Sequence, residues 1–520
     1  IRNTEPVLNK LLNRQQQHSV VIFALLCFLF FSCTEKMAED DRPNMIFVLA
    51  DDHRYDAMGF MGHSFLKTPN MDRMADRGIV FKNAYVTTSL CSPSRASILS
   101  GMYAHNHGVV DNYHSVDESL KFFPGYLKDS GYETAFIGKW HMGGEDDSPR
   151  EGFDYWLSFK GQGTYWSDGH GTSRKVPQNN SDGFNINGKR VPQKGYITDE
   201  LTDYAMDWLG EQTSKKPFML YLSHKAIHAD FVAADRHLGS FKAKMIPDST
   251  EFEPGKQTPM WVTNQRNSRH GADFAYNLAD FDINEYYRRY CETILAVDEN
   301  LGRVLYWVDN NKKRKTIVVY MGDNGFHFGE HGLIDKRTAY ETSVRVPLLM
   351  YDPYIEKGRV VNDIVANIDI APTFLDMAGV SIPDHLDGRS MKSFVQNKTL
   401  VTDWRKELLY EYYWERNYPF TPTTNALLTE RYKFIRYHGV WDLDEFYDLE
   451  DDPKELNNLI ASTEHQALIK DYRQRLFEML HESGGSSMPL LEDRGNYYPL
   501  RNPEKAKSAE FPETYFIKPK

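Results

Sequence analysis

Residues 45–50 form an unbroken apolar run that ends directly in Asp51 and Asp52. A strand with one face in water alternates apolar and polar side chains, so this run predicts a strand that is covered on both faces. Comparable runs occupy residues 134–137, 218–222 and 316–320, and residues 290–308 carry apolar side chains at helical spacing. Buried strands that alternate with helices predict an α/β fold, with a large mixed, mainly parallel sheet flanked by helices.

The pattern changes after about residue 400, where short strands follow one another. Candidate strands lie at 407–412, 425–429, 432–437 and 445–449, and a helix is expected at 466–481. These elements predict a small C-terminal α+β subdomain, residues 400–484, built on an antiparallel sheet. Residues 44–399 then form the main domain, and 485–520 form a tail rich in Pro, Asn and Lys. Residues 230–280 are irregular and polar, which indicates an insertion that faces the substrate.

The N-terminal segment resembles a bacterial export signal. Residues 20–31 are apolar throughout and follow the cations Arg2, Lys10 and Arg14. The run is shorter than the roughly 20 residues that span a bilayer, so it predicts a signal peptide at 1–32. Ser32 before Cys33 resembles a lipoprotein cleavage box, and Cys33 would then be the lipidated first residue. A plain secretory signal is the alternative. Both kinds of signal predict an exported protein, in the periplasm or on the outer membrane or cell surface. A lipid anchor would be its only contact with the membrane.

Cysteine content and charge exclude two further classes of protein. The 520 residues include four cysteines, Cys27, Cys33, Cys91 and Cys291, too few for a disulfide framework. Cys291 lies in the predicted helix 290–308 and is expected to pack as a small apolar residue. The 61 Lys and Arg against 73 Asp and Glu give a net charge of −12 without a basic run, so no nucleic-acid partner is expected. An acidic protein with an anionic substrate must gather its cations at one site.

Acidic and amide side chains follow two of the predicted strands. Asp51 and Asp52 follow the first strand, and Asp323 and Asn324 follow residues 316–320. Ligands bind outside the carboxyl ends of parallel strands, and oxygen donors suit Ca²⁺ or Mg²⁺. If the two strands are neighbours, these side chains predict a metal site. Each motif alone is also an ordinary cap or turn sequence.

A second motif places Cys91 at the start of a helix. Pro93 suits a first helical turn and Gly101 suits a helix end, which predicts a helix between them. The N-terminus of such a helix attracts anions. An inert buried cysteine is the alternative reading of the same residues.

These segments together resemble the type I, formylglycine-dependent sulfatases. Residues 91–101, CSPSRASILSG, are similar to the family signature, and Asp51–Asp52 and residues 322–325 are similar to its two metal segments. Residues 138–141, 225–228 and 329–337 are similar to three further elements, with Ile227 in place of a common proline. The six elements occur in family order within about 44–450. The resemblance implies an alkaline-phosphatase-like fold.

The resemblance also implies roles for individual residues. A maturation enzyme would convert Cys91 to formylglycine, and a hydroxyl of the hydrated aldehyde would attack sulfur and expel the sugar alcohol. One Ca²⁺ would be held by Asp51, Asp52, Asp323, Asn324 and the residue derived from Cys91. Arg95 would stabilise the hydrate, Lys139 and Lys336 would bind the sulfate, His228 would act as general acid, and His141 would assist the nucleophile or accept a proton. His53, His105, His107, His327 and His331 stay without a role, except as candidate substrate contacts.

The implied activity is hydrolysis of sulfate monoesters on a carbohydrate, with release of inorganic sulfate. Residues 185–189, 196–208, 335–337 and 365–369 resemble the N-acetylglucosamine-6-sulfatase branch. Candidate substrates are therefore 6-O-sulfated N-acetylglucosamine glycans, or algal polysaccharides such as ulvan. The family signature binds the sulfate group and does not specify the sugar. The alternatives are a phosphomonoesterase or phosphodiesterase of the same superfamily, and a glycan-capturing lipoprotein with an inactive site.

Overall fold

The computed structural model describes seven stretches of the chain: residues 40–171, 182–213, 215–247, 257–266, 282–396, 403–415 and 418–489. Residues Ile1–Asp41 form one unit and Arg42–Lys520 form a second, which is described below. The predicted signal peptide at 1–32 and Cys33 lie outside the described residues, as does the tail beyond 489. Among the described helices, none has both the length and the apolar character needed to cross a membrane.

The main domain is built on a ten-stranded sheet with β1 (Asn44–Ala50) at its centre. Parallel neighbours β7 (Phe218–Ser223) and β8 (Thr316–Gly322) flank β1 on its two sides. The sheet continues past β7 through β3 (Glu133–Gly138), β4 (Tyr155–Ser158), β5 (Phe184–Ile186) and β6 (Lys189–Val191). It continues past β8 through β9 (Leu348–Tyr351), β2 (Gly78–Tyr85) and β10 (Arg359–Ala366). Because β9 and β5 run against their neighbours, the sheet is mixed but mainly parallel, as predicted.

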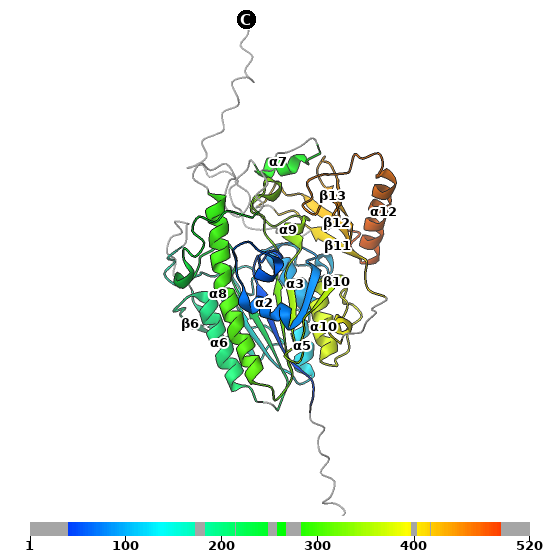
Figure 1. Ribbon diagram of the computed structural model, residues 1–520. Coiled ribbons are helices and arrows are strands. Elements are labelled where there is room, and N and C mark those ends of the chain that lie inside the picture. Colours follow the sequence, from blue (N-terminus) through cyan, green and yellow to red (C-terminus); the bar gives the residue numbers. More distant parts are fainter. Residues whose placement is uncertain are drawn as a thin grey trace, which may run out of the picture. The chain divides into compact units, whose positions relative to one another are not determined.

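Helices cover both faces of the sheet, which explains the unbroken apolar run of β1 (Figure 1). Met45, Phe47 and Leu49 belong to one core, and Ile46, Val48 and Ala50 belong to the other. The first core includes α3 (Cys91–Ser100), α5 (Phe123–Asp129) and α10 (Ile370–Met377). The second includes α2 (Pro69–Asp76), α6 (Ile197–Glu211) and α8 (Ile283–Asn310). Cys291 is buried in α8, as expected of a small apolar residue.

The C-terminal segment forms an antiparallel sheet of four strands. These are β11 (Glu407–Tyr412), β12 (Thr423–Thr429), β13 (Tyr432–His438) and β14 (Glu445–Asp448), with α12 (Gln466–Glu482) packed against them. Its apolar side chains join the same core as α3 and α10. The predicted subdomain architecture is confirmed, and its core is continuous with that of the main domain.

Several elements were not predicted. β2 and β10 interrupt their apolar residues with polar side chains, and β9 is apolar but contains only four residues. Within 230–280, predicted to be irregular, α7 (Met260–Arg266) is helical. The remaining short elements are α4 (Ala104–His107), α9 (Glu341–Val344), α11 (Lys392–Val395) and 3₁₀ turns at Gly59–Met61, Asp235–His237, Glu330–Gly332 and Asn367–Asp369.

Candidate active site

Three carboxylates converge where β1 and β8 end. The two strands pair in parallel with Ala50 opposite Gly322, so the residues that follow them are adjacent. Oxygens of Asp51, Asp52 and Asp323 lie within 4.8 Å of one another, and all three side chains are buried. The backbone N–H of Asp52 donates to Asp323 Oδ1 at 2.9 Å. Asn324 Nδ2 donates to Asp52 Oδ1 at 2.6 Å. The structure therefore brings together the four predicted metal ligands outside Cys91.

Two oxygens in this group fit a divalent cation. Asp52 Oδ2 and Asn324 Oδ1 are buried and accept no hydrogen bond from any residue that the structure describes. A buried oxygen without a partner is costly unless a ligand satisfies it. Carboxylate and amide oxygens are the donors that Ca²⁺ and Mg²⁺ take. The donor set is therefore chemically suited to such an ion.

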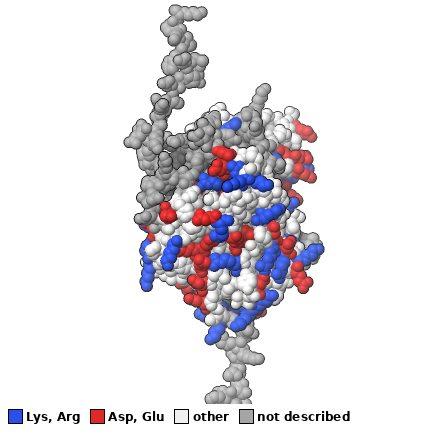
Figure 2. Space-filling model, turned by 60° about the vertical axis from the view of Figure 1, so that its left-hand side comes forward, with Lys and Arg blue, Asp and Glu red and all other residues white. Residues whose placement is uncertain are grey.

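Three cations contact the carboxylates. Arg95, on α3, reaches Asp323 Oδ2 at 2.8 Å and Asp51 Oδ2 at 3.5 Å. Lys139, which follows β3, contacts Asp51, and Lys336 Nζ lies 2.5 Å from Asp52 Oδ1. On the face shown in Figure 2, acidic and basic side chains are interspersed, whereas these three cations are buried together. Three cations of the acidic protein thus lie together at one internal site.

The cations and the burial act in opposite directions on the pKa values of the carboxyls. Burial raises the pKa of Asp51, but Lys139 and the other cations outweigh it and hold that pKa well below its usual range. Burial and the charge of Asp51 raise the pKa of Asp323 to about 7. Neighbouring carboxylates in a low-dielectric site cannot all ionise without added positive charge. The electrostatics therefore favour a further cation.

Cys91 is the first residue of α3 and faces this group of charges. The helix ends at Gly101, whose positive φ of 72° makes it the predicted helix end. The thiol Sγ donates to Asp51 Oδ1 at 3.3 Å and accepts from Lys336 Nζ at 2.9 Å. Burial and the charge of Asp51 raise the pKa of Cys91 to about 12. The unmodified thiol is therefore neutral at physiological pH and a weak nucleophile.

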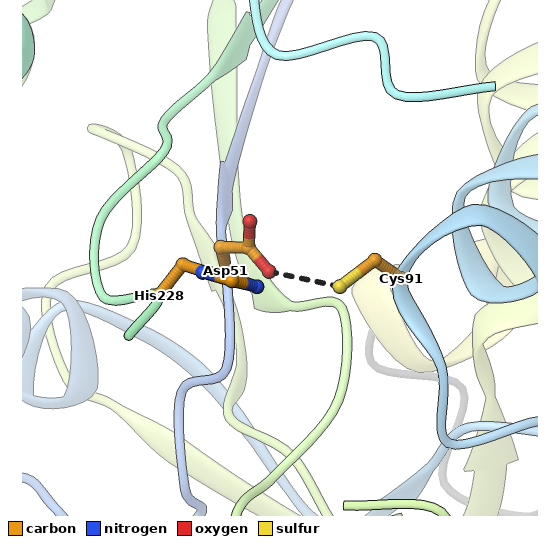
Figure 3. A group of neighbouring side chains, drawn as sticks. All are labelled: Asp51, Cys91 and His228. Atoms are coloured by element: carbon orange, nitrogen blue, oxygen red, sulfur yellow. Dashed lines mark hydrogen bonds between the residues drawn. The ribbon is translucent and has the colours of Figure 1, made fainter. Parts of the chain in front are cut away.

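His228 lies beside Cys91 in the loop that follows β7 (Figure 3). A ring nitrogen of His228, a carboxylate oxygen of Asp51 and the Cys91 sulfur lie within 4.8 Å of one another. His228 Nδ1 donates to the carbonyl of Ala229 at 2.6 Å, which fixes the ring. Burial and the charge of Lys139 hold the pKa of His228 well below its usual range. Its imidazole is neutral in this state.

His141 is held by two residues. Its Nδ1 lies 3.3 Å from Ser92 Oγ, and its Nε2 accepts from Gln162 Nε2 at 2.9 Å. Gln162 Oε1 accepts from Lys139 Nζ at 2.6 Å, so one amide connects both residues. No sequence motif indicates a role for Gln162, because its neighbours are loop residues without a recognisable pattern.

Family models match most of the chain that surrounds this site. Residues 43–380 match the model described as "Sulfatase", and residues 329–482 match "N-sulphoglucosamine sulphohydrolase, C-terminal". The chain belongs to the sulfatase family. As a sulfatase it is a sulfuric ester hydrolase, as the sequence motifs predicted.

Known proteins similar to this sulfatase include one curated relative and two solved structures. An N-acetylglucosamine-6-O-sulfatase of Bacteroides thetaiotaomicron is 33% identical over 524 residues, covering 88% of this chain and 90% of the relative. A structure solved with "its substrate D-Glucosamine-2-N, 6-O-disulfate" has 33% identity and a TM-score of 0.77, covering 85% of this chain and 98% of the other. A phosphonate monoester hydrolase of Agrobacterium radiobacter has 22% identity and a TM-score of 0.68, covering 85% and 96%, and shows the shared fold alone.

A cavity of about 430 Å³ adjoins the site of this sulfatase. His141 and Gln162 contribute to its lining, and Arg337 and Glu415 line it as well. Its other lining residues are Asn112, Tyr113, Gly144, Glu145, Gly161 and Tyr418. Gly161 and Gln162 lie in the loop that follows β4. The lining includes no described residue of 230–280, the segment predicted to face the substrate.

The histidines without an assigned role are held inside the sulfatase by hydrogen bonds or ring stacking. His53 lies 2.6 Å from Tyr320 Oη, and His105 lies 2.7 Å from Glu411. His107 contacts Ser97, His327 contacts Thr338 and Thr342, and His331 stacks on Tyr340. None of the five belongs to the lining of the 430 Å³ cavity. Their contacts support structural roles.

Proposed function

We propose that this sulfatase removes the 6-O-sulfate of glucosamine residues in a glycan, with Cys91 converted to formylglycine as the nucleophile. The observation that carries the proposal is the position of Cys91, buried at the start of α3 between Asp51 and Lys336. With a pKa of about 12, the thiol itself is a weak nucleophile at neutral pH. A hydrated aldehyde at the same position offers a hydroxyl instead. The names of the relatives support glucosamine sulfates as the substrate class.

The acidic cluster would hold one Ca²⁺. Asp51, Asp52, Asp323 and Asn324 would bind it, together with the residue derived from Cys91. Such an ion supplies positive charge that lowers the pKa of a hydroxyl nucleophile. The unpartnered oxygens Asp52 Oδ2 and Asn324 Oδ1 support this assignment.

Lys139 and Lys336 would bind the sulfate group. Both ammonium groups now neutralise Asp51 and Asp52, and a divalent cation would supply that charge in their place. The two lysines then become available to sulfate oxygens and to the charge that moves in the transition state. Arg95 stays in position, because it also donates to the Lys139 carbonyl at 2.8 Å and to Ser223 Oγ at 2.6 Å. We therefore assign Arg95 to holding Asp51 and Asp323, beside the expected stabilisation of the hydrate.

Two histidines would move the protons. His228 is placed beside the nucleophile. Its Nδ1–H donates to the Ala229 carbonyl, so its acid form is the imidazolium, which the negative charge of a bound sulfate would favour. In that form Nε2 would donate a proton to the sugar oxygen as the bond from sulfur to that oxygen breaks. His141 accepts the proton released when the aldehyde reforms and sulfate leaves. The Gln162 hydrogen bond to Nε2 leaves the proton of neutral His141 on Nδ1.

The test compares wild-type protein with Cys91→Ser, both produced with a formylglycine-generating enzyme. We expect sulfate release from 6-O-sulfated N-acetylglucosamine by the wild type alone. Mass spectrometry of the peptide containing Cys91 should show an aldehyde in place of the thiol. Full activity with an intact thiol, or equal activity of the two proteins, contradicts the proposal.

Two further comparisons separate the alternatives. Faster cleavage of 4-nitrophenyl phosphate than of 4-nitrophenyl sulfate would indicate the phosphatase alternative. A panel that adds ulvan oligosaccharides tests the algal substrates, and preferred turnover of an ulvan fragment would replace the glucosamine assignment.

Export as a lipoprotein is part of the proposal and is supported by the apolar run at 20–31 and by Cys33. In a bacterial host, labelled fatty acid should enter the wild-type protein and not the Cys33→Ala variant. Equal labelling of both, or none of either, contradicts lipidation at Cys33.

A further inference from the structure

Glu415 lines the 430 Å³ cavity and carries one carboxylate oxygen without a hydrogen-bond partner among the described residues. It follows β11, belongs to the C-terminal subdomain and is 1% exposed. Its Oε2 accepts from Arg337 Nε at 2.5 Å and from Tyr412 Oη at 3.0 Å. Its Oε1 has no hydrogen-bond partner among the residues that the structure describes. His141 and Gln162 line the same cavity.

Other buried glutamates of this subdomain use both of their oxygens. Glu411 accepts from the His105 backbone through Oε1 and contacts the His105 ring and Tyr413 through Oε2. Glu445 accepts from three tyrosine hydroxyls through its two oxygens. An unsatisfied buried acceptor is costly, so the free oxygen of Glu415 indicates a donor that arrives with a ligand.

The surroundings of Glu415 are fixed and contain one cation for two carboxylates. Arg337 contacts Asp335 Oδ1 at 2.7 Å as well as Glu415, and its guanidinium lies 3.3 Å from the centre of the Tyr418 ring. Asp335 Oδ2 in turn accepts from Gln265 at 3.0 Å. One arginine thus shares its charge between two carboxylates. This end of the cavity therefore suits a neutral hydrogen-bond donor better than a second anion.

We infer that Glu415 is a specificity-determining residue whose Oε1 accepts a hydrogen bond from a hydroxyl of the sugar that carries the cleaved sulfate. The inference rests on the proposed function, because the sugar must occupy the cavity beside His141. The cavity volume lies within the range of about 300–1,000 Å³ that is usual for small-molecule sites. Recognition of the sugar then depends on the C-terminal subdomain, whereas the sulfate is bound in the main domain.

The experiment measures kcat/KM for 6-O-sulfated N-acetylglucosamine and for 4-nitrophenyl sulfate, whose ring has no hydroxyl. In Glu415→Gln, the amide oxygen must accept the hydrogen bond from Arg337. An N–H₂ group, which can only donate, then replaces the acceptor Oε1. We expect the sugar-to-aryl ratio of kcat/KM to fall about tenfold or more. Glu445→Gln is the matched control, a buried glutamate with tyrosine partners that does not line this cavity, and it should leave the ratio unchanged.

Deoxy sugars identify the hydroxyl. Removing the 3- or the 4-hydroxyl from the sulfated sugar should cost the wild type about tenfold in kcat/KM at one position. The same removal should cost Glu415→Gln little, because the two changes abolish one hydrogen bond. If Glu415→Gln does not fold, Glu415→Asp replaces it in the experiment. The shorter side chain keeps the negative charge but moves the carboxylate away from the cavity.

Three results would overturn the inference. The first is an unchanged sugar-to-aryl ratio in the Glu415 variant, with sugar and aryl turnover lost in parallel, as for a purely structural brace. The second is a wild-type kcat/KM that stays the same when either the 3- or the 4-hydroxyl is removed. The third is a wild type that cleaves the aryl sulfate but not the sugar, which refutes the role of Glu415 and leaves sulfatase activity intact. A wild type that cleaves neither compound refutes the proposed function itself.

Discussion

Gln162 donates a hydrogen bond from Nε2 to Nε2 of His141 over 2.9 Å. A side-chain amide nitrogen can only donate, so the imidazole nitrogen accepts and the ring proton of neutral His141 lies on Nδ1. The amide cannot rotate freely, because its oxygen accepts from Lys139 Nζ at 2.6 Å. Gln162 therefore links the orientation of Lys139, which we propose binds sulfate, to the protonation of His141.

Replacing Gln162 should lower kcat more than it raises KM. In Gln162→Glu, a carboxylate faces His141 Nε2 and draws a proton onto it. In Gln162→Ala, both links are lost. We expect kcat for 4-nitrophenyl sulfate to fall roughly 10- to 100-fold in both, within the range of general acid–base contributions. Gln212→Ala, at the end of α6, should match the wild type. Wild-type kcat in Gln162→Ala would refute the positioning role.

The convergence of the acidic side chains could be predicted from the sequence, and the contact of Gln162 could not. Asp51 and Asp323 follow unbroken apolar runs, and parallel strands end at a common edge, so their meeting follows from the strand pattern. Roles for the single residues Lys139 and His228 came only from the family resemblance. Gln162 lies in a loop without periodicity, and no local pattern indicates its partners.

Glu415 shows a second limit of sequence reasoning. Its contact with Arg337 joins residues 78 positions apart, in two parts of the chain that were predicted as separate domains. The strands on either side could be predicted, because their own residues carry the pattern. The packing of one sheet edge against the other domain is set by side-chain shape across the whole core, which a single sequence does not display.

Removal of the metal should abolish activity and lower the melting temperature. We expect inactivation by EGTA, recovery with Ca²⁺, and a melting temperature that rises with Ca²⁺ concentration, since a ligand of the folded state stabilises it. Asn324→Ala removes one buried oxygen donor and should need more Ca²⁺ for both effects. Asn311→Ala, at the end of α8, should behave as the wild type. Full activity of protein shown by elemental analysis to be free of metal would contradict the assignment.

The stability of the protein should fall as the pH rises through the titration of Glu445. Burial raises the pKa of Glu445 to about 7 from its usual 4.5, although three tyrosine hydroxyls partly oppose the shift. Between these values the folded state binds more protons than the unfolded state, so the free energy of unfolding decreases with pH. The loss is up to roughly 3 kcal/mol, at about 1.4 kcal/mol for each pKa unit.

Glu445→Gln should flatten this dependence, because the amide does not titrate. Urea unfolding of the two proteins at pH 5 and pH 8 measures the difference in slope. Glu430→Gln, an exposed glutamate in the turn that follows β12, should keep the wild-type slope. Equal slopes for Glu445→Gln and the wild type would show that Glu445 does not titrate in this range.

Lys433→Met should be among the most destabilising single changes. Lys433, on β13, is fully buried, and its Nζ lies 2.8 Å from Glu341 on α9 and 2.7 Å from Glu455. Removal of the ammonium leaves buried Glu455 without a counter-charge and Glu341 with Arg345 alone, at 3.5 Å, which costs about 3–5 kcal/mol. Lys406→Met is the control, since Lys406 is 75% exposed, lies 3.7 Å from Asp363, and belongs to a class of pair worth about 0–1 kcal/mol. In Lys433→Met combined with Glu341→Gln and Glu455→Gln, no buried charge remains, so part of the stability should return. The urea midpoints of the wild type, Lys433→Met, Lys406→Met and the triple variant measure these differences. Equal midpoints for Lys433→Met and Lys406→Met would mean that the buried lysine does not stabilise the junction between the two domains.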